Sequence, residues 1–319
     1  MAEISAKAVK ELRERTGLPM MDCKRALQES GGDPEAALEW LRKAGKKTME
    51  QRAGKETSFG RIAVWTDPAG SAGAMIELRC ESAPVAANEE FVALANDLAR
   101  QLATGPGAAT ADELLDQPSP SRPGQSLRQQ FDDLLNRIRE MFRLQRIVRV
   151  DGRCAGYVHH NGSAGVIVQI EGGNLEVAKD VCMQVVSMRP SVIRREELAA
   201  EVVEKERQIL MEAVQNEAEA LRQEAAEYRS GKRALTEADS GASPGPSPAA
   251  MALNLERKAE NLVKNRAKIA EGRLRELFYA KHCLLDQPFV KDSKQTVGKL
   301  VEAAGMKIIR FVRWELGKE

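Results

Sequence analysis

Apolar residues in the first 46 positions recur at helical spacing and predict three short helices. Thr16-Gly17 ends the first helix, and Gly31-Gly32 ends the second. Asp33-Pro34 begins the third, because an aspartate N-cap followed by proline at the first helical position is a typical start. We therefore predict a three-helix bundle over residues 1–46, followed by a polar, glycine-broken linker over residues 47–59.

The segment after this linker contains an internal repeat. Residues 60–76 and 152–168 each read as a β-hairpin, and the tetrapeptide Gly-Ser-Ala-Gly at 70–73 returns at 162–165. Each hairpin precedes an amphipathic helix, so we predict a duplicated core with subdomains at 60–143 and 144–200. The first copy holds an insertion at 80–88 between strand and helix. This insertion is either a tolerated loop or a site of added function, and the pattern leaves both readings open.

Composition and periodicity change between the two copies. Residues 116–126 are rich in proline, serine and glycine, which predicts a loose loop. A helical stripe follows from Phe131 to Ile138. Residues 144–150 then alternate as a strand that we expect to enter the second hairpin.

Residues 201–278 show two long apolar stripes, which predict an antiparallel helical hairpin that protrudes as a coiled coil. Between the stripes, residues 238–254 are rich in alanine, serine and proline, and we expect a disordered tip there. Residues 279–319 are predicted to form a C-terminal module with a helix near 297–301 and a strand at 308–315. These elements assign the chain to the α+β class.

Composition narrows the classes of function. The 319 residues include 48 basic and 47 acidic side chains, a net charge of +1, with 43% hydrophobic and 4% aromatic residues. Balanced charge removes the strongest argument for a nucleic-acid coat or a polybasic membrane patch. We find no apolar run long enough for a membrane span and no secretory pattern at the N-terminus. The five scattered cysteines are typical of a reduced cytosolic protein.

Motifs that carry catalysis or bind metals are missing from the sequence. It has no glycine-rich phosphate loop and no G-x-S-x-G, so we predict that the protein is not an enzyme. His159 and His160 would face opposite sides of an extended strand and could not chelate one metal, which favours a structural or interface role for His159. Met20 and Met21 are either core filler or an adaptable partner contact, and periodicity alone favours the core.

Several segments resemble the bacterial translation elongation factor Ts family. They are, in chain order, VKELRERTGLPMMDCKRAL at 9–27, EKER at 204–207, EGRL at 271–274, QPFVKD at 287–292, TVG at 296–298 and FVRWE at 311–315. The resemblance implies a ubiquitin-associated-like (UBA-like) N-terminal bundle, a duplicated α+β core, a protruding coiled coil and a C-terminal module. It also implies a cytoplasmic protein without a cofactor.

The resemblance further implies a protein partner. The family binds elongation factor Tu, a GTPase, and promotes GDP release by distorting the nucleotide and Mg²⁺ site, with no covalent chemistry. Neither nucleic acid nor a membrane is implied as a direct partner. A one-to-one complex and a dimeric two-to-two complex are both compatible with the sequence.

The same resemblance implies contact roles for individual residues. Arg13, Met20 and Met21 match positions that contact the GTPase domain, which favours the contact reading for the two methionines. Ile138 and His159 match an interface isoleucine and an interface histidine of the family. Arg139 stands where the family has glycine.

The largest departure from the family lies in the insertion at 80–88. The family has Thr-Asp-Phe-Val there, near the Mg²⁺ side of the nucleotide site, and this chain has Ser82, Ala83, Pro84 and Val85. The carboxylate and the aromatic ring are lost. Our hypothesis is that the segment docks at the same place and acts through backbone shape, with Pro84 stiffening it. The alternative is a scaffold or chaperone that binds elongation factor Tu with weak exchange activity.

Overall fold

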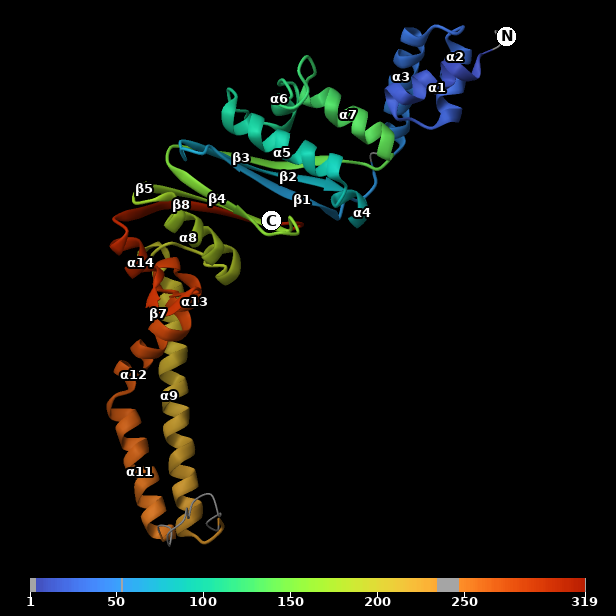
Figure 1. Ribbon diagram of the computed structural model, residues 1–319. Helices are drawn as coiled ribbons and strands as arrows, with labels where there is room; N and C mark the ends of the chain where they lie inside the picture. Colours follow the sequence, from blue (N-terminus) through green and yellow to red (C-terminus); the bar gives the residue numbers. More distant parts are fainter. Residues whose placement is uncertain (1–3, 53, 234–246, 319) are drawn as a thin grey trace. The chain divides into compact units, whose positions relative to one another are not determined.

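The chain folds into two compact units, which are described separately. The computed structural model describes residues 4–52, 54–233 and 247–318 (Figure 1). The first unit comprises the residues up to Ser187 together with those from Ala304 onward, and the second comprises Met188–Ala303. Helices and antiparallel sheets are both present, which confirms the α+β class.

The N-terminal bundle consists of α1 (Ala6–Thr16), α2 (Met20–Glu29) and α3 (Pro34–Arg52). Ser5 caps α1 by accepting the Ala8 N–H at 3.1 Å, and Gly17 ends it in the left-handed conformation at φ 69°. The three helices share one small core, formed by Val9, Leu12, Cys23, Ala26, Leu27, Ala37 and Leu41. The three predicted helices are therefore confirmed.

The predicted linker begins too early. Helix α3 continues to Arg52, so the 47–59 segment is helical up to that residue, and the first strand begins at Phe59. Lysine, glutamate, glutamine and methionine all favour helix, and a single glycine such as Gly45 costs only about 1 kcal/mol. Polar composition alone therefore does not end the helix.

The first sheet is formed by β1 (Phe59–Thr66), β2 (Ala72–Cys80) and β3 (Arg143–Asp151). It is antiparallel in the order β1-β2-β3, which confirms the first predicted hairpin. The chain between β2 and β3 forms α4 (Ala83–Ala86), α5 (Glu89–Thr104), α6 (Ala111–Leu115) and α7 (Leu127–Ile138). Helices α5 and α7 are amphipathic and bury their apolar sides in the core of this sheet.

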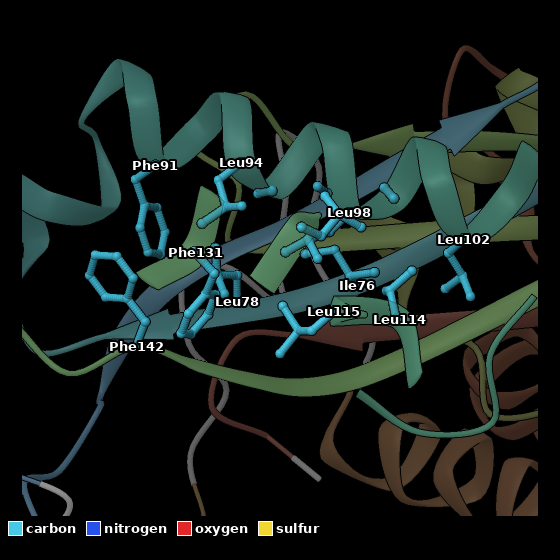
Figure 2. Packing of buried hydrophobic residues seen from close by; sticks show 14 of the residues in the cluster. Ile76, Leu78, Phe91, Leu94, Leu98, Leu102, Leu114, Leu115, Phe131 and Phe142 are labelled. Carbon is cyan, nitrogen blue, oxygen red and sulfur yellow. The ribbon is translucent and has the colours of Figure 1, made fainter. Parts of the chain in front are cut away.

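The main core of the first unit lies between α5 and the first sheet. Figure 2 shows Leu94 and Leu98 of α5 pointing toward the strand that carries Ile76. Phe142 packs edge-on against Phe91, with ring centroids 5.0 Å apart. Burial of each side chain of this kind stabilises the fold by about 1.5–3 kcal/mol relative to leaving it exposed to water. The core thereby fixes the end of β2 and the start of α5, between which the insertion at 80–88 lies.

The second sheet is formed by β4 (Cys154–Val158), β5 (Ala164–Gly172) and β8 (Met306–Glu315). The antiparallel β4–β5 pair confirms the second predicted hairpin. Helix α8 (Leu175–Met188) packs on this sheet, where Cys182 Sγ donates to Ala155 O at 3.3 Å. Two predicted boundaries are corrected here. Residues 144–150 belong to β3 of the first sheet, and the strand at the end of the predicted 279–319 module is β8 of the second.

A shared plan of the two sheets explains both corrections. The second strand of each hairpin is mostly buried, as is typical of a central strand that has a neighbour on both sides. Strand β3 fills this place in the first sheet and β8 fills it in the second, each with a bulge at the corresponding position. The sheets pack face to face around one apolar cluster, formed by Ile62, Met75, Val150, Cys154 and Ile167.

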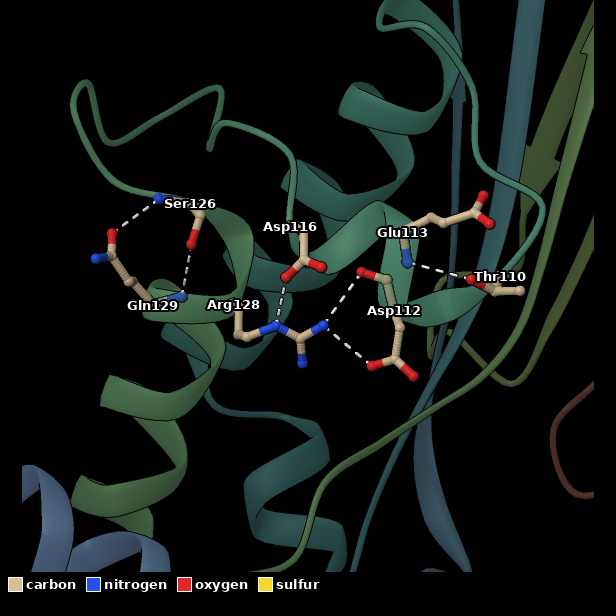
Figure 3. Close-up of polar contacts among 7 residues, drawn as sticks. All are labelled: Thr110, Asp112, Glu113, Asp116, Ser126, Arg128 and Gln129. Carbon is tan, nitrogen blue, oxygen red and sulfur yellow. Dashed lines mark hydrogen bonds and ion pairs between the residues drawn. The ribbon is translucent and has the colours of Figure 1, made fainter.

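The segment predicted to be loose is hydrogen-bonded to its surroundings (Figure 3). Arg128 at the start of α7 donates from Nε to Asp116 Oδ1 at 2.6 Å and from Nη2 to Asp112 Oδ1 at 3.0 Å. Ser126 and Gln129 form a reciprocal capping box at the end of the same segment. Composition misleads here because residues outside 116–126 supply many of these bonds.

The second unit contains a long antiparallel helical hairpin. Helix α9 (Ala200–Arg229) packs along α11 (Pro248–Lys264) and α12 (Arg266–Arg273). The ion pairs Arg229–Glu256 and Arg273–Glu217 cross between the arms. The seam between them is apolar and includes Leu210, Val214, Ala218, Ala225, Ala252, Leu255 and Ala259. The predicted disordered tip is corrected in part, because α11 already begins at Pro248, and 238–246 lies outside the described residues.

The remainder of the second unit is built from short elements. They include a π-helical turn (Leu274–Tyr279), α13 (Ala280–His282), β6 (Pro288–Phe289), β7 (Asp292–Thr296) and α14 (Val297–Ala303). The helix predicted near 297–301 is confirmed as α14. Within the described ranges, no helix has the length and hydropathy that a membrane span needs.

All five cysteines are buried. Burial raises the pKa of Cys80, Cys154 and Cys283 to about 11 and that of Cys182 to about 12. Because the thiolate is the reactive form, we expect iodoacetamide to modify these four side chains at neutral pH at least about a hundredfold more slowly than free cysteine. Mass spectrometry of native and urea-denatured samples measures this difference. Rapid labelling of the folded chain would contradict the expectation.

Candidate partner interface

Met20 and Met21 begin α2 and project into solvent, with 52% and 70% of their surfaces exposed. The inward positions of this helix are filled by Cys23, Ala26 and Leu27 instead. The interpretation of the two methionines as core filler is therefore wrong. Flexible apolar side chains exposed side by side are typical of an adaptable contact surface.

Arg13 lies on the same surface as the methionines. Helices α1 and α2 line an open groove, here called the methionine groove, whose residues are Ile4, Ala6, Val9, Lys10, Arg13, Glu14, Gly17, Met20, Met21 and Lys24. The structure thus brings three sequence-predicted residues into one place. Three cations and one carboxylate border the apolar side chains, so the groove suits a partner that is apolar at the centre and mainly acidic at the rim.

The insertion at 80–88 folds as a short helical turn between β2 and α5. Ser82 precedes α4, and the Ala87 N–H donates to Ala83 O at 3.2 Å. Ala83 and Pro84 are exposed at the tip, while Val85 packs against the core of the first sheet. The Ser82–Val85 turn therefore presents backbone and small apolar surface, with neither a charge nor an aromatic ring at its tip.

The end of α7 carries two further predicted residues. Ile138 is half-buried against the core of the first sheet. Arg139 is the C-cap in the left-handed conformation at φ 63°, which costs roughly 1–2 kcal/mol for a residue with a side chain. Its guanidinium pairs with Asp22 of α2. Arg139 thereby ties the end of α7 to the helix that carries Met20 and Met21.

His159 lies in the turn after β4 and not within a strand. Its ring is beside that of His160, with centroids 4.2 Å apart, so the prediction that the two imidazoles face opposite sides is wrong. The chain reverses here with Gly162 in the left-handed conformation at φ 73°. His159 Nδ1 lies 2.9 Å from Asn161 Oδ1, which orients the ring. In the part of the chain that the structure describes, no group of three histidine, cysteine or carboxylate residues is placed to hold a metal ion.

The polar residues that fix the Ser82–Val85 turn could not be found from the sequence. Glu81 accepts a hydrogen bond from Arg52 Nη2 at 2.7 Å and another from the Met141 N–H at 2.7 Å. The hydrogen bond from Arg52 is the main reason that the pKa of Glu81 lies below its usual value. These partners are 29 and 60 positions from Glu81, so no local pattern reveals them.

Comparison with known proteins places the chain in a family. The family described as Elongation factor TS matches residues 84–318. The elongation factor Ts of Methylococcus capsulatus is 35% identical over 318 residues, which cover 99% of this chain and 92% of that protein. The chain belongs to the elongation factor Ts family. The elongation factors Ts of Aquifex aeolicus and Clostridium botulinum are 35% and 33% identical and cover 98% and 99% of this chain, with 98% and 93% of their own lengths matched.

Membership in the elongation factor Ts family confirms the resemblance found in the sequence. The chain is accordingly an elongation factor of protein synthesis. The family match includes Ile138, Arg139 and His159, and the relatives extend the similarity over the methionine groove. All parts of the candidate interface therefore lie in regions that this chain has in common with elongation factors Ts.

Proposed function

We propose that this chain binds elongation factor Tu carrying GDP and accelerates release of the nucleotide in the cytoplasm during translation elongation. The observation that carries the proposal is the exposed methionine groove, in a chain that belongs to the elongation factor Ts family over nearly its whole length. The protein acts by binding and makes or breaks no covalent bond, so it is not an enzyme in this proposal.

Nucleotide release follows from linkage between two binding events. GDP and Mg²⁺ stabilise one shape of the GTPase, and this chain binds a distorted shape more tightly. The free energy by which this chain prefers the distorted shape is subtracted from the free energy of GDP binding. Such a coupling free energy is typically about 1–3 kcal/mol, which lowers the affinity for GDP about 5–150-fold. The effect is reciprocal, so bound GDP also weakens the affinity of the GTPase for this chain.

Two surfaces have different roles in the proposal. The methionine groove supplies affinity, because burying Met20 and Met21 removes apolar surface from water. The Ser82–Val85 turn supplies the distortion through its backbone, which Pro84 stiffens. Three further residues extend the contact: Ile138, Arg139 and His159.

Release of a fluorescent GDP analogue from elongation factor Tu tests the proposal. The loaded GTPase is mixed with excess unlabelled GDP in the presence of increasing concentrations of this chain. We expect the release rate to rise and to saturate as the complex forms. A rate that stays at its intrinsic value, with a chain shown to be folded by circular dichroism, overturns the proposal.

Replacing residues 82–85 by Gly-Ser-Gly-Ser is expected to lower the saturating release rate about tenfold, because the segment loses Pro84 and gains backbone freedom. Binding of the GTPase, measured by calorimetry, should weaken less, since the methionine groove is unchanged. A variant that releases GDP as fast as the unsubstituted chain would show that the turn does not distort the nucleotide site.

A scaffold that binds elongation factor Tu without speeding exchange is the second candidate function. One observation favours it: the exposed tip of the turn carries Ala83 and Pro84, and neither side chain has an oxygen atom that could coordinate Mg²⁺. Calorimetric binding combined with an unaltered rate of GDP release would select this candidate.

A further inference from the structure

The Ser82–Val85 turn is hydrogen-bonded to Glu140, which lies just after α7. Ser82 Oγ donates to Glu140 Oε1 at 2.6 Å. The other carboxylate oxygen, Oε2, is buried and has no hydrogen-bond partner within the residues that the structure describes. Glu140 is therefore enclosed by protein around its carboxylate and is not a freely solvated surface side chain.

The turn cannot hold its shape by itself. Helix α4 has four residues, far fewer than an isolated helix needs in water. Ser82 is its N-cap but makes no side-chain capping bond, since its hydroxyl is directed to Glu140. The conformation of the turn therefore depends on contacts from outside the segment.

Glu81 and Met141, which adjoin Ser82 and Glu140, form a second hydrogen bond between the same two segments. Glu81 accepts the Met141 N–H at 2.7 Å and is held by Arg52, whose Nε and Nη2 donate at 3.2 and 2.7 Å. Only 16% of the Glu81 side chain is exposed, so water screens this pair less than a surface ion pair. The turn is thus fixed at two successive residues.

Residues 139–141, here called the brace, also contact the helix that carries Met20 and Met21. Arg139 pairs with Asp22, the neighbour of Met21 in α2. Glu140 and Met141 hold the turn, as described above. One short segment therefore connects the Ser82–Val85 turn to helix α2, which carries Met20 and Met21.

We propose that Glu140 is a positioning residue for nucleotide exchange, which holds the Ser82–Val85 turn, through Ser82, in the shape that acts on the GTPase. This inference rests on the proposed function. A turn with no charge or ring at its tip acts through the position of its backbone, and a backbone ordered in advance avoids the ordering cost on binding. Without Glu140, fewer bound complexes hold the competent arrangement, which lowers the saturating rate.

Hydrogen–deuterium exchange of the free chain tests the brace without any partner. Glu140→Ala is expected to speed exchange of peptides covering residues 81–88 at least about tenfold, because the amides of α4 open more often. Glu171→Ala is a matched control, since Glu171 forms an exposed ion pair with Lys307, and it should leave those peptides unchanged. Unaltered exchange in Glu140→Ala overturns the proposal, whether or not the chain acts on GDP release.

Stopped-flow release of GDP separates positioning from a purely structural role. Glu140→Ala is expected to lower the saturating rate about tenfold and to change the half-saturating concentration less than about threefold. Glu140→Gln keeps an acceptor oxygen for Ser82 and should retain most of the rate. Combining Ser82→Ala with Glu140→Ala should lower the rate no further than the larger single loss, because both changes remove the same hydrogen bond.

Each outcome decides a separate point. If the saturating rate of the double variant falls by the product of the two single reductions, Ser82 and Glu140 act independently, and the proposal is overturned. An unaltered saturating rate in a Glu140→Ala chain with a loosened turn would do the same. If the unsubstituted chain does not accelerate release, the proposed function is rejected on that result, and hydrogen exchange still decides whether Glu140 holds the turn.

Discussion

Glu77→Ala is expected to lower the free energy of unfolding by about 3–5 kcal/mol, as removal of one partner from a buried ion pair does. Glu77 in β2 is fully buried, and its carboxylate accepts hydrogen bonds from Arg79 Nε and Arg146 Nε, each at 2.6 Å. The two arginine side chains are only 21% and 24% exposed. Without the carboxylate, two largely buried guanidinium groups lose their counter-charge.

The same carboxylate connects the first sheet to the end of β8. Its Oε1 accepts the Gly317 N–H at 3.3 Å. Arg146 donates from Nη2 to Glu315 O at 3.3 Å, and its guanidinium carbon lies 4.7 Å from the ring centroid of Trp314. Removing Glu77 therefore weakens contacts of β2, β3 and β8 together. We expect the decrease in the free energy of unfolding to lie in the upper part of the range of about 3–5 kcal/mol.

Urea unfolding followed by circular dichroism measures this loss. Glu171→Ala removes an exposed carboxylate and should change the free energy of unfolding by less than about 1 kcal/mol. Glu77→Gln keeps the shape of the side chain without its charge, so its free energy of unfolding should lie between those of Glu77→Ala and Glu171→Ala. If Glu77→Ala does not fold, Glu77→Gln still measures the contribution of the charge. An alanine variant with the unfolding midpoint of the unsubstituted chain would contradict the expected role.

Substituting both Met20→Asp and Met21→Asp is expected to slow GDP release at subsaturating concentrations about a hundredfold or more. Burying a methionine side chain contributes about 1.5–3 kcal/mol, and each 1.4 kcal/mol is about tenfold in affinity. The two side chains are 52% and 70% exposed in the free chain, so their loss should leave the fold intact. The half-saturating concentration in the release assay measures the change.

Met188→Asp is the matched control for this experiment, because Met188 is 40% exposed and lies outside the methionine groove. It should leave the half-saturating concentration unchanged. Unfolding midpoints of all three chains should agree, which separates loss of contact from loss of fold. Full acceleration by the double aspartate variant would mean that the groove is not the contact surface.

Local sequence patterns predicted the hairpins and most helices because these elements form through interactions between residues that are close in the sequence. Gly-Ser-Ala-Gly marks the turn of each hairpin, and both turns are present. The partners of the third strands were not predictable in this way. Residues 144–150 adjoin the second hairpin in the sequence but pair with β2, and the contact of Gln169 with Arg310 spans 141 positions. Alternation of apolar and polar residues identifies a strand but does not identify the strand with which it pairs.

The candidate site was predictable to a similar degree. Periodicity finds Met20 and Met21 on a helix but cannot separate an apolar side chain that faces the core from one that faces a partner. Only the packing of Cys23 against α1 and α3 shows that the core is filled without them. Glu140 gives no local signal either, because its partner Ser82 lies 58 positions away.

The order of the strands along the chain has a consequence for synthesis on the ribosome. The free side of β5, residues 164–172, pairs with β8, which begins at Met306. During translation of everything between these strands, the nascent chain carries an unpaired strand edge that other chains can join. The second sheet can close only after β8 has emerged, so β5 keeps an unpaired side throughout synthesis of residues 173–305.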